Sequence, residues 1–108
     1  MLGVTTPLKT GSRLRSQVCT TEVIVVRPGS REIALACGGH PLIEIGAAPA
    51  DGLAIDPAFG GGTLLGKRYT LPDDDTLEIL ATKGGDGALS DGTTLLVPKE
   101  AKPLPASD

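Results

Sequence analysis

Four β-branched residues follow one another at positions 23 to 26 of this chain, within residues 22–27 (EVIVVR). Branching at Cβ restricts side-chain rotamers in a helix, whereas a pleated strand accommodates these residues well. Because successive side chains of a strand point to opposite faces, this run is apolar on both faces. The segment therefore predicts a central strand that is covered on both sides.

A second strand is predicted shortly after the first. Residues 28–30 (PGS) have the composition of a turn. Residues 32–37 (EIALAC) then alternate between apolar and small or polar side chains, with Cys37 on the apolar face. We expect residues 22–27 and 32–37 to form a β-hairpin, within a ribbon-like β unit at 13–45.

Glycine and proline interrupt the rest of the chain, with 15 Gly and 9 Pro among 108 residues. Both disfavour helix interiors, and no long helical segment is predicted. A Gly/Ala/Pro loop at 46–62 precedes a second β unit at 63–98, and the charged, Pro-rich segment 99–108 is expected to be a flexible tail. We predict a single all-β domain, 1–108, with its two units packed as one barrel or sandwich.

The loop at 46–62 is longer than most connections inside a compact domain, which is typical of a functional segment, a linker or a subunit arm. Its apolar residues are Leu53, Ile55 and Phe59. These side chains either pin the loop to its own domain or reach into a neighbouring chain.

Aromatic residues are nearly absent, since Phe59 and Tyr69 are the only two. The core must then be thin, which favours added stability from a metal, a disulfide or a partner subunit. A net charge of −3 without aromatic stacking platforms argues against nucleic-acid binding. No segment approaches the ~18 apolar residues of a membrane span, and no signal peptide is recognised. A cytoplasmic protein that does not enter a membrane is expected.

Candidate metal ligands are Cys19, Cys37 and His40, the two cysteines and the single histidine of the chain. Cys37 and His40 have the spacing of a metal-binding knuckle, whereas Cys19 stands alone. A tetrahedral Zn or Fe site needs four ligands. The fourth would be a carboxylate, a water, Ser16 or a residue of a second chain.

Four interpretations of the cysteines stay open at this point. They can be small buried hydrophobic residues, ligands of a metal, or partners in a disulfide that is structural or regulatory. One of them can also be a catalytic thiol with His40 as its base. A cytoplasmic location disfavours the structural disulfide.

Residues 15–45 resemble the ribbon of desulforedoxin and of the desulfoferrodoxin N-terminal domain, which has rubredoxin-like knuckles. In this resemblance Ser16-x-x-Cys19 stands at the first knuckle. Residues 22–26 stand at the first strand, and 36–42 (ACGGHPL) stand at the second knuckle.

The desulforedoxin family binds one iron through four thiolates, so the resemblance implies that Cys19 and Cys37 are ligands. Ser16 and Ala36 stand where the other two cysteines would be. With half of the thiolates missing, the resemblance does not support a tetrathiolate iron centre within one chain.

Two further motifs are interpreted as turns. The acidic run at 73–75 lacks the fixed-offset ligands of a cation-binding loop. The glycine runs at 60–62 and 84–87 (GGDG) lack the Lys-Ser/Thr sequence that follows a phosphate-binding loop.

The sequence matches no common catalytic template. We predict a non-enzymatic accessory or structural subunit that acts through a protein partner or as a homo-oligomer, without a cofactor. The alternative is a small metal-binding or thiol-redox protein that uses Cys19, Cys37 and His40. Its metal would be Zn or Fe, and its chemistry would be electron transfer or thiol exchange.

Overall fold

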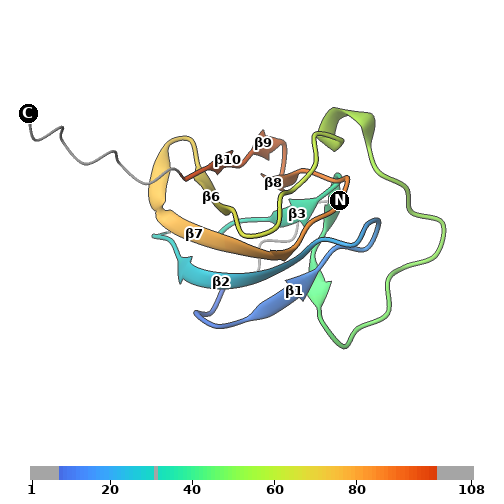
Figure 1. Ribbon diagram of the computed structural model, residues 1–108, viewed down its shortest axis with the longest axis horizontal. Coiled ribbons are helices and arrows are strands. Elements are labelled where there is room, and N and C mark those ends of the chain that lie inside the picture. The colour runs from blue at the N-terminus through green and yellow to red at the C-terminus, as the bar shows by residue number, and fades with distance from the viewer. Residues whose placement is uncertain (1–7, 31, 100–108) are drawn as a thin grey trace, which may run out of the picture.

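The computed structural model describes residues 8–30 and 32–99, which contain ten strands and one short 3-10 helix joined by loops (Figure 1). The strands form two antiparallel sheets, which confirms the predicted all-β class. The predicted flexible tail, 99–108, lies outside the described residues except for Lys99.

The larger sheet has six strands in the order β10-β6-β7-β2-β1-β5. Their bounds are Val97–Pro98 (β10), Arg68–Leu71 (β6), Asp74–Lys83 (β7), Glu22–Pro28 (β2), Arg13–Arg15 (β1) and Ile43–Glu44 (β5).

The smaller sheet has four strands in the order β4-β3-β8-β9. Their bounds are His40–Pro41 (β4), Leu35–Cys37 (β3), Leu89–Asp91 (β8) and Thr94–Leu95 (β9). The end of the predicted second β unit, residues 94–98, is thus divided between the sheets. It changes sheet at Leu96, whose side chain is buried.

β2 is a central strand, as its composition predicts, and lies between β7 and β1. Val23 and Val25 are almost fully buried in the core. Ile24 and Val26 alternate with them and are half-buried. One face of β2 is therefore buried in the core and the other is half-covered, while β1 and β7 occupy its two hydrogen-bonding edges.

The predicted hairpin of 22–27 with 32–37 is wrong. β2 pairs with β1 and β7, whereas β3 pairs with β4 and β8 in the other sheet. Of the turn predicted at 28–30, Pro28 still belongs to β2, and the chain bends after it: Gly29 has a φ of 81° and Ser30 is a bend. A Cβ atom on Gly29 would lie 3.3 Å from Cβ of Leu77 in β7. The turn therefore carries the chain out of one sheet toward the other, rather than back along β2.

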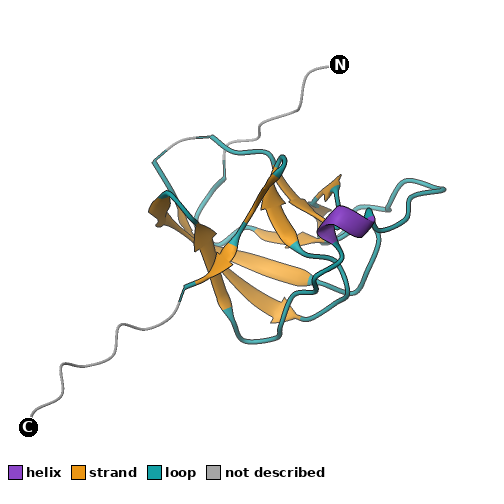
Figure 2. Ribbon diagram, turned by 90° about the horizontal axis from the view of Figure 1, so that it is seen from above, coloured by secondary structure: helices purple, strands orange, loops and turns teal. Residues whose placement is uncertain are grey.

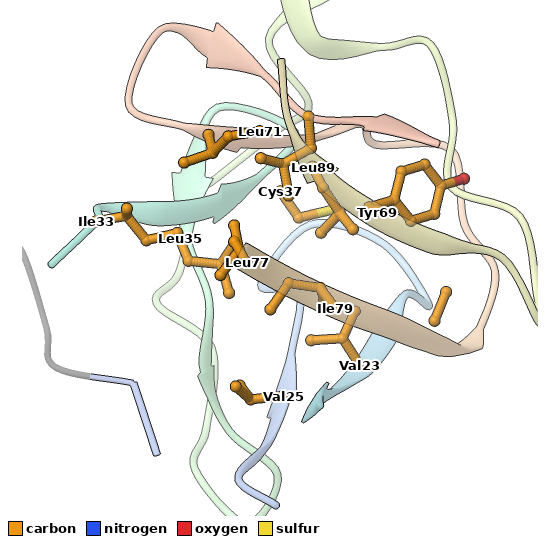
Figure 3. Packing of buried hydrophobic residues seen from close by; sticks show 12 residues of the cluster. Val23, Val25, Ile33, Leu35, Cys37, Tyr69, Leu71, Leu77, Ile79 and Leu89 are labelled. Atoms are coloured by element: carbon orange, nitrogen blue, oxygen red, sulfur yellow. The ribbon is translucent and has the colours of Figure 1, made fainter. Parts of the chain in front are cut away.

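The core lies between the sheets and takes side chains from both (Figure 3). Strands of the predicted units 13–45 and 63–98 interleave within it, since β2 pairs with β7 and β3 pairs with β8. The residues are mostly aliphatic: Val23, Val25, Ile33, Leu35, Cys37, Tyr69, Leu71, Leu77, Ile79, Ala81, Leu89 and Leu96. Cys37 is part of this core, which brings a thiol to the junction of the two sheets.

The long loop is held against its own domain at its second half. The 3-10 helix η1, Pro57–Phe59, packs there (Figure 2). The N–H of Asp56 donates to the carbonyl of Gly38 over 2.9 Å, and the N–H of Ala88 donates to the carbonyl of Phe59 over 2.7 Å. Of the two roles predicted for Leu53, Ile55 and Phe59, the structure supports attachment of the loop to its own domain.

In the described ranges, no helix has the length and apolar character needed to cross a membrane.

Candidate functional site

The two cysteines meet at the junction of the sheets. Cys19 lies in the turn at 16–21 that connects β1 to β2, and Cys37 ends β3. Their Sγ atoms are 3.8 Å apart, and both are free thiols. Cys37 is fully buried, whereas Cys19 is partly exposed. The pair therefore combines one partly exposed cysteine with one that solvent does not reach.

Ser16 fixes the turn that presents Cys19. Its Oγ accepts hydrogen bonds from the backbone N–H groups of Val18 and Cys19, each over 3.1 Å. A hydroxyl has two acceptor positions and one hydrogen. With both acceptor positions occupied, the remaining O–H is free to donate to Sγ of Cys19, which lies 3.2 Å away. Ser16 is fully buried, so water does not compete for this bond.

Thr21 supplies a second hydroxyl to the same sulfur. Its Oγ1 lies 3.3 Å from Sγ of Cys19, and its side chain is fully buried at the start of β2. Its carbonyl accepts the N–H of Ser16 over 2.9 Å, which closes the turn. The sequence analysis considered Ser16 as a metal ligand and gave Thr21 no role. The structure places both hydroxyls beside Cys19.

The glycine run at 84–87 packs closely against the pair. Gly85 and Gly87 do not have a positive φ, so their backbone conformation does not require glycine. A Cβ atom on Gly85 would lie 2.9 Å from Sγ of Cys19, and one on Gly87 would lie 3.1 Å from Sγ of Cys37. These residues are glycine because the backbone approaches the thiols closely. The sequence analysis interpreted them as turn residues.

The two thiols have different pKa values because their surroundings differ. Partial burial raises the pKa of Cys19, but hydrogen bonds from Ser16, Thr21 and the backbone N–H of Gly87 outweigh it and lower the pKa to about 7. Burial, together with the negative charge on Cys19, raises the pKa of Cys37 to about 11. Near neutral pH, Cys19 therefore ionises to the nucleophilic thiolate much more readily than Cys37, which keeps its proton.

His40 follows Cys37 across a two-glycine turn, and Nε2 of its ring lies 2.8 Å from the carbonyl oxygen of Ala54. Among residues 8–30 and 32–99, no three His, Cys, Asp or Glu side chains are grouped closely enough to hold a metal ion. The structure thus brings together Cys19 and Cys37 but no three-ligand group with His40. A site for Zn or Fe stays a prediction.

No family model, curated protein or solved structure matches this chain.

A separate apolar hollow of about 830 Å³ lies beside β1 and β5. Its walls include Leu8, Leu14, Ile33, Leu42 and Ile43. Neither cysteine lines it, so the hollow and the thiol pair are different features of the surface.

Replacing Ser16 by alanine is expected to raise the pKa of Cys19 from about 7 toward 9, because the thiolate loses a hydrogen-bond donor. The rate of alkylation of the reduced protein by iodoacetamide, followed against pH with mass spectrometry, measures this pKa. Ser90→Ala is the matched control, since Ser90 is equally buried but donates to the carbonyl of Gly92. Identical midpoints in wild type and Ser16→Ala would contradict the role given to the Ser16 hydroxyl.

Proposed function

We propose that this protein is a thiol-redox protein in which Cys19 and Cys37 convert between a dithiol and a disulfide. The observation that carries the proposal is the distance of 3.8 Å between their Sγ atoms. A disulfide bond is about 2.05 Å long, so the sulfurs must approach each other by about 1.8 Å. Cys19 lies in a turn outside the strands, and this approach therefore requires no change of register in either sheet.

The difference between the two thiols gives each a role. The accessible Cys19 thiolate attacks one sulfur of an external disulfide and releases the other sulfur as a thiolate. Cys37 then loses its proton and attacks Sγ of Cys19 in the mixed disulfide, which releases the second external thiolate. Both external thiolates take up a proton. The protein is oxidised by two electrons and the external disulfide is reduced to two thiols, and the reverse sequence restores the dithiol.

The proposal is tested by equilibrating the protein in buffers with increasing ratios of glutathione disulfide to glutathione. We expect both thiols to disappear together in one two-electron transition, with an intramolecular disulfide identified by peptide mapping. The single variants Cys19→Ser and Cys37→Ser cannot form it. Retention of both thiols, or a product that carries glutathione on Cys19 without ring closure, would refute the redox pair.

The interaction role favoured by the sequence stays a prediction. Exposed leucines are consistent with it, since Leu64 and Leu65 are 62% and 69% exposed. Light scattering of the purified protein tests the homo-oligomeric form directly, because self-assembly would give a mass above that of one chain.

A further inference from the structure

We propose that the outward face of the larger sheet binds an acidic, extended segment of a partner protein. This inference goes beyond the proposed redox pair, because it concerns a different surface and does not depend on the cysteines. It follows from the charged and aliphatic side chains that the strand registers bring together on that face.

One row of the larger sheet places two arginines and two aliphatic residues on the outward face. In β2, Ile24 follows the core residue Val23 and therefore points outward. Its partners point to the same side of the sheet, and they are Arg13 of β1 and Leu80 of β7. Leu80 pairs in turn with Arg68 of β6. The row thus crosses four strands, with an arginine at each end and two aliphatic side chains between them (Figure 1).

Neighbouring positions on the same face add more charge. Strand pairing or an ion pair places six further charged residues there: Arg15, Glu22, Arg27, Glu78, Lys83 and Lys99. Together with Arg13 and Arg68, these side chains carry six positive and two negative charges, whereas the whole chain has a net charge of −3. A positive face on an acidic protein favours an anionic partner.

Three arginines of this face have no carboxylate of their own. Each of the two carboxylates is paired with a lysine over 3.1 Å. Arg13, Arg15 and Arg27 form no ion pair with another described residue. Glu44 of β5 does not neutralise them, because it pairs with Leu14 and so points to the core side of the sheet. A guanidinium group can donate two parallel hydrogen bonds to a carboxylate or a phosphate, and these arginines can therefore receive such groups from a partner.

The aliphatic centre of the row favours a protein over a nucleic acid. Ile24 and Leu80 are half-buried, and a phosphate backbone has no apolar group to cover them. Single-stranded nucleic acids place their bases on aromatic side chains. Of the two aromatic residues, Phe59 lies in η1 and Tyr69 lies in the core, so neither belongs to this face. A peptide with aliphatic side chains between its carboxylates matches both features of the row.

The width of the row specifies the spacing of those side chains. Neighbouring strands are about 4.8 Å apart, so three steps separate Arg13 from Arg68 by about 14 Å. An extended peptide advances about 3.4 Å per residue, and every second side chain points to the same side. Carboxylates four positions apart, with an aliphatic residue midway, would therefore meet the two arginines and the aliphatic centre together.

The test measures fluorescence anisotropy of a labelled peptide, ESLSESLSE, which has this spacing, in a reducing buffer. We expect saturable binding that weakens as salt is added. Arg13→Glu is expected to weaken binding by about tenfold, because it replaces an attraction by a repulsion, and adding Arg27→Glu weakens it further. Lys67→Glu is the matched control, since it changes the net charge equally. The exposed Lys67 precedes Arg68, and its carbonyl accepts the N–H of the core residue Ala81, so it points away from this face.

Two further probes separate the acidic peptide from other anions. The peptide ESSSESSSE keeps the carboxylates without the leucines, and oligothymidylate carries phosphates. We expect both to bind more weakly than ESLSESLSE. The inference is overturned if wild type does not bind ESLSESLSE, if Lys67→Glu weakens binding as much as Arg13→Glu, or if either further probe binds as tightly. Circular dichroism checks that each variant folds, and the glutathione equilibration tests the redox pair separately.

Discussion

Oxidation of the Cys19–Cys37 pair is expected to raise the free energy of unfolding by about 3 kcal/mol relative to the reduced protein. The cysteines are 18 positions apart, and closing a loop of this length removes conformational freedom from the unfolded chain. The link also joins the two sheets, because Cys19 follows β1 of the larger sheet and Cys37 ends β3 of the smaller one. A thin aliphatic core makes the added stability a large fraction of the total.

Urea denaturation of the oxidised protein and of the same sample after reduction measures this difference. Cys19→Ser is the control, since oxidation can form no intramolecular disulfide in that variant. We expect its unfolding midpoint to be the same in both conditions. The expectation is contradicted if the unfolding midpoint of the oxidised wild type equals or falls below that of the reduced protein. In that case the strain that the disulfide places on the folded sheets is at least as large as the stabilisation that it gives by restricting the unfolded chain.

Local sequence patterns predicted the strands of this fold but not their partners. The β-branched run at 23–26 indicated a central strand because the signal depends only on the faces of that strand. Its main partner, β7, lies some fifty residues further along the chain, and no local pattern specifies such a pairing. The chain bends at Gly29 and Ser30, within the turn predicted at 28–30, but a turn does not determine whether the chain returns along the same strand or crosses to another sheet.

The functional site was predicted only in part, again because local patterns do not specify which distant residues meet. Cys19 and Cys37 were singled out by residue type, and their pairing was one of four open interpretations. Their meeting depends on how the two sheets pack, which the sequence pattern does not specify. Gly85 and Gly87 were interpreted as turn residues because their run lacks the sequence of a phosphate-binding loop. A run of three glycines in four positions is also the signal of a close backbone approach, and here that is its role.

Gly85→Ala is expected to destabilise the reduced protein by about 1–3 kcal/mol, the usual effect of overpacking. The new Cβ would lie 2.8 Å from the backbone nitrogen of Thr21 and 2.9 Å from Sγ of Cys19. The backbone of Thr21 cannot easily move, because Thr21 is fully buried and its carbonyl accepts the N–H of Ser16. The segment at 84–87 must therefore withdraw from the thiols.

This withdrawal has a second, independent consequence at the site. The N–H of Gly87 contributes to the low pKa of Cys19, so its displacement is expected to raise that pKa above 7 and to leave less Cys19 thiolate at neutral pH. Gly46→Ala is the matched control: Gly46 lacks a positive φ, and a Cβ there would meet no atom within 4 Å. Urea denaturation and the alkylation titration measure the two effects. If Gly85→Ala unfolds and titrates like Gly46→Ala, the glycines do not shape the thiol pair, and their close approach has no bearing on its chemistry.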